Sequence, residues 1–237
     1  MSIISVNLQA VEQAIATAAQ AANRPRSAVQ LLAVSKTFPF EAVLDAMQAG
    51  QRAFGENYLQ EGVDKIAAVA AAAPGVPLEW HFIGPIQSNK TRPIAENFAW
   101  VHAIDRLKIA QRLSEQRPAN LSPLNVCLQV NISGEASKSG VPPADLPDLA
   151  RQVAALPNLR LRGLMAIPEP ESDAAKQHLP FEQVRLLYEQ LQRDGMALDT
   201  LSMGMSGDLA AAIAEGATIV RIGSAIFGAR SYNKEPA

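Results

Sequence analysis

Short apolar segments recur along this chain, and nearly every one is followed by a stretch with helical periodicity. Alternation of this kind is typical of βα units, which place their strands parallel to one another in one sheet. Eight such segments are present, which is the number that closes an α/β barrel. We predict strands over 31–35, 52–56, 78–83, 99–104, 125–130, 161–166, 200–203 and 219–222.

The segments between these strands predict helices, most of them bounded by Pro, Gly, Asp or Ser. The weakest follows the third strand, because residues 88–97 are few and include Pro93. An extra helix over 7–22 precedes the first strand, and we expect it to cover the bottom of the barrel. The other helices are predicted over 40–49, 58–72, 106–115, 143–156, 177–193 and 209–214.

The predicted fold is therefore α/β, a single (β/α)8 TIM barrel forming one domain over residues 1–237. The length of 237 residues suits it, since such barrels commonly have ~250 residues. The rival is a doubly wound open sheet, which usually carries a glycine-rich phosphate turn after its first strand. At that position residues 36–39 read Lys-Thr-Phe-Pro, and no G-x-G-x-x-G occurs in the chain.

Charge and composition exclude several classes of function. The formal net charge is −2, with acids and bases interleaved, so we expect no nucleic-acid partner. Cys127 is the only cysteine, which rules out an internal disulfide and a thiolate metal cage. It lies in an apolar strand and is interpreted as a packed core thiol. Because the start does not resemble a leader and the alanine-rich run 67–73 is too short to cross a bilayer, we expect a cytoplasmic protein with no membrane partner.

Lys36 ends the first predicted strand, after an apolar run and just before the chain turns into a helix. An ammonium is costly to desolvate, so this lysine should reach solvent, pair with an anion, or have a lowered pKa. A lowered pKa would make it a nucleophile able to form a Schiff base with a carbonyl compound. The strand pattern alone favours the simpler interpretation, in which Lys36 marks the solvent end of the strand.

Polar residues also collect at the ends of other predicted strands, where the active site of an α/β barrel lies. The loops after strands seven and eight commonly form a phosphate site in this fold, and here they contain Ser206-Gly207-Asp208 and Gly223-Ser224. Each could direct backbone N–H groups at an anion, although each alone is only a helix start. Together, opposite Lys36, they favour a phosphate site. Further strand-end residues are Glu56, Asn57, Gln87, Ser88, Asn89, Lys90, Asn131 and Arg221.

The three histidines do not suggest a metal site, because none has metal-ligand spacing. His81 and His102 lie inside apolar strands, where a hydrogen-bonded core histidine is commoner than a catalyst. His178 follows an exposed helix start. Glu56 and Asp105 could belong to an acid/base pair, but the sequence does not give their separation.

Six segments in fixed order resemble the pyridoxal phosphate homeostasis protein family, and the resemblance runs over nearly the whole chain. A lysine at the end of the first strand and two glycine- and serine-containing segments near the end of the chain are among them. The segments are Leu32 to Thr37, Phe54 to Tyr58, Trp80 to Lys90, Gly163 to Met165, Leu201 to Ser206 and Val220 to Gly228.

The resemblance implies a barrel of the alanine racemase N-terminal domain type, that is, pyridoxal phosphate (PLP) fold type III. It implies pyridoxal 5′-phosphate as cofactor, bound as a Schiff base to Lys36, with Arg221 facing the pyridine nitrogen. Asn57 would lie beside the ring. Ser224 stands where the family often has threonine and keeps the hydroxyl. The phosphate would be held by Ser202, Gly223 and Ser224, with Ser206 and Met203 nearby.

The expected function is a carrier in vitamin B6 homeostasis with little or no turnover. An always-charged arginine keeps the ring nitrogen unprotonated and weakens the electron sink, although racemases of this barrel type tolerate one. The chain ends soon after Arg230, so the β-rich C-terminal domain of related racemases is expected to be absent. A PLP-dependent racemase, or a Schiff-base aldolase, on the same barrel remains the alternative, and a scaffold with a vestigial site is a third.

The partners expected besides the cofactor are apo PLP-dependent enzymes that would receive it, and we expect the protein to be a monomer. Lys138 and Lys234 are either secondary anion contacts or solvated lysines of exposed segments.

Overall fold

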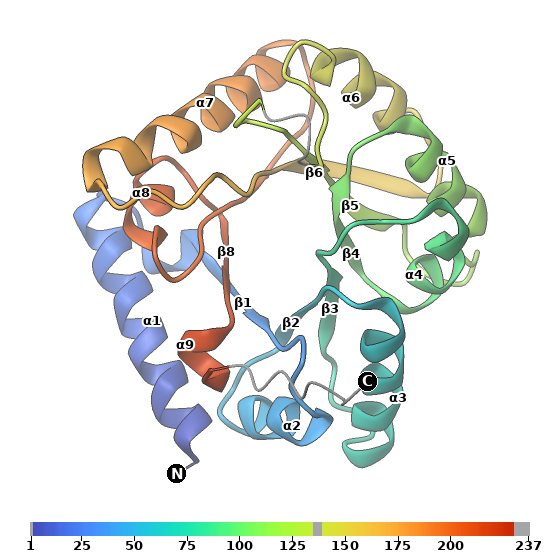
Figure 1. The fold of residues 1–237 in the computed structure, drawn as a ribbon. Helices are drawn as coiled ribbons and strands as arrows, with labels where there is room; N and C mark the ends of the chain where they lie inside the picture. Colours follow the sequence, from blue (N-terminus) through green and yellow to red (C-terminus); the bar gives the residue numbers. More distant parts are fainter. Residues whose placement is uncertain (1, 135–138, 230–237) are drawn as a thin grey trace, which may run out of the picture.

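The structure is a closed barrel of parallel strands surrounded by helices (Figure 1). It is a computed structural model that describes residues 2–134 and 139–229. Neighbouring strands follow the order of the chain, and β8 closes the ring by pairing with β1, which confirms the predicted architecture. The strands are β1 (Gln30–Val34), β2 (Ala53–Glu56), β3 (Glu79–Phe82), β4 (Trp100–Ile104), β5 (Leu124–Gln129), β6 (Leu159–Met165), β7 (Thr200–Ser202) and β8 (Ile219–Ile222).

Helices follow the strands and cover the outside of the barrel, as the alternating pattern predicts (Figure 1). The predicted weak helix after β3 is a 3-10 turn, η2 (Ser88–Lys90), followed by the short α4 (Thr91–Asn97). Pro93 lies in the first turn of α4, where no N–H donor is needed. The other helices after strands are α2 (Phe40–Gln48), α3 (Leu59–Ala72), α5 (Leu107–Gln116), α6 (Leu146–Ala154), α7 (Ala174–Arg193), α8 (Leu209–Ala214) and α9 (Ser224–Phe227).

The N-terminal helix α1 (Ile3–Ala21) does not cover the bottom of the barrel, so that part of the prediction was wrong. It packs against α2, α8 and α9 and completes the outer ring (Figure 1). One contact is a hydrogen bond of 2.9 Å from Asn7 Nδ2 to the carbonyl of Ile226 in α9. The physical reason is that α9 has one turn only and leaves a gap beside β8 that α1, with its buried face, fills.

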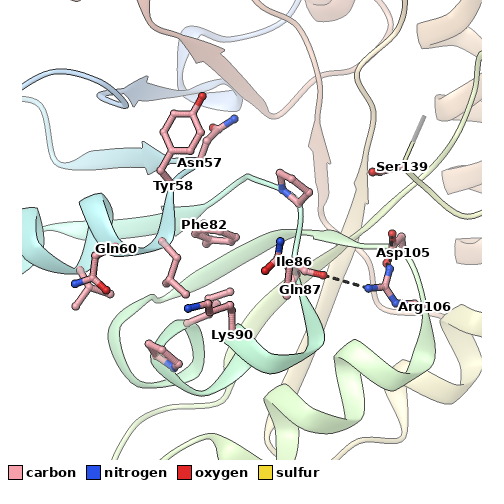
Figure 2. A pocket seen from close by; sticks show the side chains of 15 residues that line it. Asn57, Tyr58, Gln60, Phe82, Ile86, Gln87, Lys90, Asp105, Arg106 and Ser139 are labelled. Atoms are coloured by element: carbon pink, nitrogen blue, oxygen red, sulfur yellow. Dashed lines mark hydrogen bonds and ion pairs between the residues drawn. The ribbon is translucent and has the colours of Figure 1, made fainter. Parts of the chain in front are cut away.

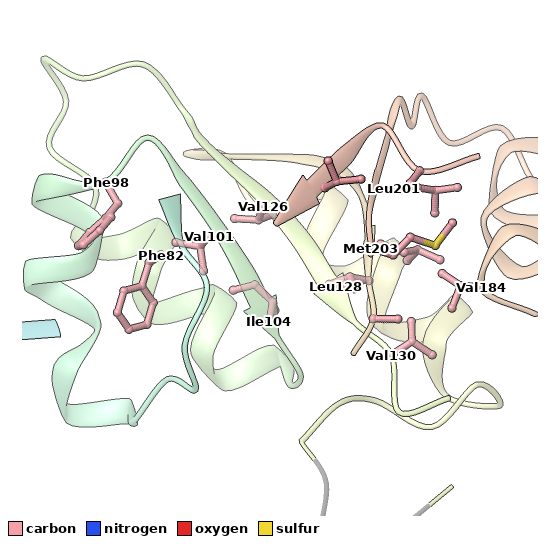
Figure 3. Packing of buried hydrophobic residues seen from close by; sticks show 14 of the residues in the cluster. Phe82, Phe98, Val101, Ile104, Val126, Leu128, Val130, Val184, Leu201 and Met203 are labelled. Carbon is pink, nitrogen blue, oxygen red and sulfur yellow. The ribbon is translucent and has the colours of Figure 1, made fainter. Parts of the chain in front are cut away.

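The main hydrophobic core lies between the strands and the helices. Alternate strand residues point outward into it, such as Val126 and Leu128 of β5 (Figure 3). Beside α7, Val184 of that helix packs in the same core as Leu201 and Met203 (Figure 3). Burial of these side chains fixes the register of the strands, because a slip by one residue would exchange the inward and outward sets.

The residues that point into the barrel fall into two groups. One part of the interior is apolar and contains Leu32, Val34, Ala53, Ile83 and Ile219. The other part holds the small cluster of Trp100, Ala103, Cys127 and Met165, beside buried polar side chains.

Cys127 is a packed core thiol, as predicted, since its side chain is completely buried. Burial raises the pKa of this thiol to about 12. No helix within residues 2–134 and 139–229 is long and apolar enough to cross a membrane. Lys138 and Lys234 lie outside the described residues.

Candidate functional site

Lys36 lies just beyond β1 at the carboxyl end of the barrel and is half-buried. Leu32 and Val34 belong to the inward-facing set of this strand, so the strand alternation puts Lys36 on the same side. The next residue, Thr37, has a φ of 69°, in the left-handed region that non-glycine residues rarely adopt. This turn redirects the chain from the strand into α2 immediately after the lysine.

A buried ion pair between Lys65 and Glu56 lies on the outer side of the barrel wall and holds the backbone next to Lys36. Lys65 of α3 donates to Glu56 Oε1 at 2.7 Å and to the carbonyl of Ser35 at 2.8 Å. The Ser35 hydroxyl donates to the same Glu56 oxygen at 2.6 Å. The side chain of Lys65 is 3% exposed and that of Glu56 is 0% exposed. Burial raises the pKa of Glu56, and the Lys65 ammonium opposes that rise.

Lys65 also helps to fix Thr37, the residue that follows Lys36. Lys65 donates to Glu61 Oε1 at 2.9 Å, and the backbone N–H of Thr37 donates to that oxygen at 2.6 Å. The residues on both sides of Lys36 are therefore tied to one ammonium. Nothing in the sequence pattern indicates this cluster, and of its members only Glu56 was expected in a functional pair, with Asp105. The structure instead pairs Asp105 with Arg106 at 2.8 Å.

Arg221 is buried near the carboxyl end of β8, with its guanidinium in fixed contacts. It donates to the carbonyl and the hydroxyl of Ser202 at 2.6 and 2.9 Å, and to the carbonyl of Ala166 at 3.0 Å. Burial lowers the pKa of Arg221 to about 10. The group is therefore still a cation at neutral pH.

The predicted site residues come from four adjacent strand ends, in the order β7, β8, β1 and β2. The N–H of Arg221 bonds the carbonyl of Gly204, which joins β8 to the segment after β7. The carbonyl of Val34 lies 3.1 Å from the position that a Cβ on Gly223 would take. On the other side of β1, the N–H of Ser35 bonds the carbonyl of Gly55. The structure thus brings Lys36, Asn57, Ser206, Arg221, Gly223 and Ser224 to one arc of the barrel mouth.

The β7 and β8 ends of this arc present small, accessible residues. Ser206 and Ser224 are exposed, and Gly223 is half-buried directly before the first turn of α9. The loop before α8 is held by Asp208, whose carboxylate accepts a 2.6 Å hydrogen bond from the N–H of Met205. Gly204 supports the same loop, since it has a φ of +96° and a Cβ there would lie 2.5 Å from Cβ of Ala212.

Ser202 and Met203 are not at the surface of the mouth, although the resemblance implied that Ser202 would hold the phosphate and that Met203 would lie near it. The Ser202 hydroxyl is completely buried and lies between Arg221 and His102. The Met203 side chain is also completely buried and points into the core between barrel and helices (Figure 3). The reason is the strand alternation, which turns Ser202 into the barrel and Met203 away from it.

Asn57 closes the β2 end of the arc and lines a cleft of about 390 Å³ at the mouth. Its Oδ1 is buried and has no hydrogen-bond partner among the described residues. The β2 and β3 ends approach very closely here, because a Cβ on Gly84 would lie 2.2 Å from the carbonyl oxygen of Asn57. The apolar rim of this cleft includes the exposed side chains of Ile167 and Met205.

A second cleft, of about 770 Å³, lies outside the arc and shares Asn57 with it (Figure 2). Gln87 and Lys90, predicted at the end of the third strand, line this outer cleft. Arg106 on its far side donates to the carbonyl of Ile86 at 3.2 Å. Of the strand-end residues singled out in the sequence, Asn57 and Asn131 line the first cleft and Gln87 and Lys90 the second, whereas Lys36 and Arg221 line neither of these two clefts.

His81 and His102 are completely buried and hydrogen-bonded, as predicted for core histidines. His81 Nδ1 lies 2.9 Å from His102 Nε2, and His102 Nδ1 lies 2.8 Å from the Ser202 hydroxyl. His178 instead pairs with Glu215 at 3.0 Å on the outside. Within the part of the chain that the structure describes, no group of three or more His, Cys, Asp or Glu could hold a metal ion.

Comparison with known proteins identifies the family. A family model described as alanine racemase, N-terminal domain, matches residues 6–231. The pyridoxal phosphate homeostasis protein of Pseudomonas aeruginosa is 65% identical over 232 residues, which cover 98% of each chain. The chain belongs to the pyridoxal phosphate homeostasis protein family. The resemblance in the sequence motifs is thereby confirmed.

Solved structures agree with this family assignment. PipY of Synechococcus elongatus with PLP bound has 37% sequence identity and a TM-score of 0.82, covering 95% of this chain and 100% of that one. An alanine racemase from Corynebacterium glutamicum has 17% identity and a TM-score of 0.68. The match covers 99% of this chain and 64% of the racemase, and at this identity it shows a common fold only.

Proposed function

We propose that this member of the pyridoxal phosphate homeostasis proteins binds pyridoxal 5′-phosphate at the barrel mouth, holds it as a Schiff base on Lys36, and serves as a carrier with little or no turnover. The support from relatives is the name of the Pseudomonas aeruginosa protein and the PLP-bound state of PipY. The support from the structure is the arc of polar residues around Lys36.

The observation that carries the proposal is the buried cationic Arg221 at the same end of the barrel as Lys36. Its hydrogen bonds within the described residues go to Ser202 and Ala166, and none goes to a carboxylate. An arginine is only a hydrogen-bond donor, so it suits an unprotonated ring nitrogen and not a protonated one. This donor set fits pyridoxal phosphate in a form that is a weak electron sink.

The remaining residues of the arc fit the other parts of the cofactor. Gly223 and Ser224 would hold the phosphate, with Ser206 beside them, since small residues let backbone N–H groups approach an anion. Asn57, whose Oδ1 lacks a partner, would lie beside the ring. Ser202 and Met203 are buried beneath the barrel mouth and would not touch the phosphate, and Ser202 would position Arg221.

When bound, pyridoxal phosphate would supply an aldehyde that condenses with a primary amine, with release of water. Lys36 would provide the resident amine, and its turn is held by the Lys65 cluster from the outer side. We further propose one domain over residues 1–237 that acts as a monomer and passes the cofactor to apo PLP-dependent enzymes.

The proposal is tested with Lys36→Ala and with Lys108→Ala as a matched control, because Lys108 is an exposed lysine of α5. Borohydride reduction of wild type mixed with pyridoxal phosphate should attach the cofactor to the peptide that contains Lys36. The control should behave like wild type, whereas Lys36→Ala should lose the label and the visible absorption. Incubation of the loaded wild type with single amino acids, followed by chiral chromatography, should give no sustained turnover. Full labelling of Lys36→Ala would refute the lysine assignment, and steady multiple turnovers would refute the carrier role.

A further inference from the structure

We propose that Arg221 is positioned by a one-way chain of hydrogen bonds that runs through the inside of the barrel. The chain consists of Ser202, His102, His81 and Glu79, and it ends on a carboxylate at the opposite end of the barrel. The inference rests on the proposed function, because Arg221 matters to the cofactor only if it faces the pyridine ring. It adds three positioning residues that come from β3 and β4, the side of the barrel away from β8.

Every link in the chain is short. From Arg221 Nη1 to the Ser202 hydroxyl the distance is 2.9 Å, and from that hydroxyl to His102 Nδ1 it is 2.8 Å. From His102 Nε2 to His81 Nδ1 it is 2.9 Å, and from His81 Nε2 to Glu79 Oε1 it is again 2.9 Å. Arg221 lies near the carboxyl end of β8, whereas Glu79 is the first residue of β3. The chain therefore crosses the interior from the mouth to the bottom.

When both imidazoles are neutral, the two ends of this hydrogen-bond chain determine the direction of every hydrogen bond in it. Arginine is only a donor and an ionised carboxylate is only an acceptor. Since Glu79 accepts, His81 carries its proton on Nε2 and accepts on Nδ1. His102 then carries its proton on Nε2 as well, and its Nδ1 accepts from the Ser202 hydroxyl. That hydroxyl uses its single proton there and accepts from Arg221, so all links point the same way.

The surroundings keep the two imidazoles neutral and fixed. Both rings are completely buried, and burial lowers the pKa of each, with His102 well below its usual value. His81 stacks on Trp100 with ring centroids 5.3 Å apart and an interplanar angle of 4°. The hydrogen bond from His81 is the main reason that the pKa of Glu79 falls to about 2. The carboxylate thus stays ionised, which the one-way order requires.

The chain supplies what the direct contacts of Arg221 lack. A buried cation needs compensating negative charge or aligned dipoles. Successive hydrogen bonds of one direction polarise one another, so the Glu79 charge is felt at Ser202 through two aligned imidazoles. The chain also leaves Ser202 only one orientation for its hydroxyl, which sets where the Arg221 guanidinium can lie.

The first test needs no cofactor. Nitrogen-15 NMR of the protein labelled at histidine should show His81 and His102 as neutral rings protonated at Nε2, near neutral pH. The half-buried His178, which pairs with Glu215 on the outside of the barrel, serves as an internal reference for a ring outside the hydrogen-bond chain. A proton on Nδ1 of either buried ring, or a protonated imidazolium, would overturn the chain whatever the protein binds.

The second test uses Glu79→Gln, in which an amide oxygen still accepts from His81 but carries no charge. Gln30→Ala is the matched control, because Gln30 donates to the same Glu79 oxygen from outside the chain at 3.2 Å. With Glu79→Gln the visible absorption maximum of bound pyridoxal phosphate should move, and its dissociation constant should rise by between about twofold and about thirtyfold. His102→Phe, which removes a link, should weaken binding by about tenfold or more. Gln30→Ala should match wild type in both readouts.

The outcomes separate the two proposals. Suppose that the wild type binds pyridoxal phosphate and that Glu79→Gln has the same spectrum and dissociation constant. This result would overturn the proposed hydrogen-bond chain and leave the carrier function intact. A wild type that never develops the visible band overturns the proposed function, and the NMR result then still decides whether the chain exists. If His102→Phe fails to fold, Glu79→Gln carries the test, because the Glu79 side chain is 41% exposed and its replacement disturbs little packing.

Discussion

Lys65 is the residue on which the geometry around Lys36 most depends. Its ammonium is buried, yet it donates to three oxygens, of Ser35, Glu56 and Glu61, so that its charge is fully engaged. Buried ion pairs are often neutral in their effect on stability when both partners are replaced together. Removal of one partner is different, because it leaves the other charge uncompensated.

We therefore predict that Lys65→Met lowers the free energy of unfolding by about 3–5 kcal/mol, since Glu56 stays buried without a cation. The pKa of Glu56 is already raised by burial, and loss of Lys65 raises it further. A folded-state pKa above the unfolded value means that stability is lost as pH rises through it. The deficit of the variant should thus be larger at alkaline than at mildly acidic pH, as measured by urea denaturation.

The control for this prediction is Lys108→Met, an exposed position on α5 where the change should stay within about 0.5 kcal/mol. A pH-independent deficit in Lys65→Met would contradict the assignment of the effect to Glu56.

Residue-level prediction from the sequence worked where position along a strand decides the outcome. Lys36 and Arg221 were expected at strand ends facing the mouth, and the strand alternation puts both on the inward side. What the sequence could not supply is which inward residues meet. His102 and Ser202 are 100 residues apart in the chain, and their contact depends on the closure and register of the whole barrel. The Lys65 cluster was missed because a lysine on a helix normally lies in solvent.

At the scale of elements, the close approach of the β2 and β3 ends depends on one glycine. A Cβ on Gly84 would collide with backbone atoms of Asn57. Backbone atoms cannot move aside as the end of a flexible side chain could. We predict that Gly84→Ala lowers the free energy of unfolding by about 1–3 kcal/mol and weakens binding of pyridoxal phosphate through displacement of Asn57. Gly207→Ala is the comparison for stability, since nothing lies within 4 Å of its Cβ position. Equal melting temperatures of the two variants would contradict this account.

The elements themselves were largely predictable, because each strand has an apolar face that must be buried. The ends of all eight strands lie within two residues of the predicted ones. Helix starts were less accurate: α1 begins at Ile3 and α7 at Ala174. In both cases a residue just before the helix caps it, Ser2 through the N–H of Ser5 and Asp173 through the N–H of Ala175. The placement of α1 in the outer ring depends on the shortness of α9, which only the assembled barrel reveals.

At the scale of the whole molecule, the sheet of the barrel is a wall that separates two polar systems, the Lys65 cluster and the hydrogen-bond chain from Glu79 to Arg221. The Lys65 cluster lies between the sheet and α3, outside the wall, and holds the backbone on both sides of Lys36. The chain from Glu79 to Arg221 lies inside it. Both systems end at the same mouth, so a local opening of the barrel would disturb them together. Rigidity of the closed sheet is therefore a requirement of the proposed site, and it can be measured directly.

Cys127 offers that measurement, because it is the only cysteine and lies completely buried inside the barrel. Only a thiolate reacts with disulfide reagents, and the pKa of about 12 leaves little of it at neutral pH. We predict that labelling of the native protein is slower than that of the unfolded chain by a factor of about 10³ to 10⁸, the range of folding equilibrium constants. We expect only global unfolding to expose β5 in the closed barrel, so the free energy of opening obtained from the labelling rate should equal that from urea denaturation. Cys127→Ser has no thiol and serves as the blank for the labelling measurement. Rapid labelling of the native protein would mean that the barrel opens locally, and neither polar system could then hold its residues in place.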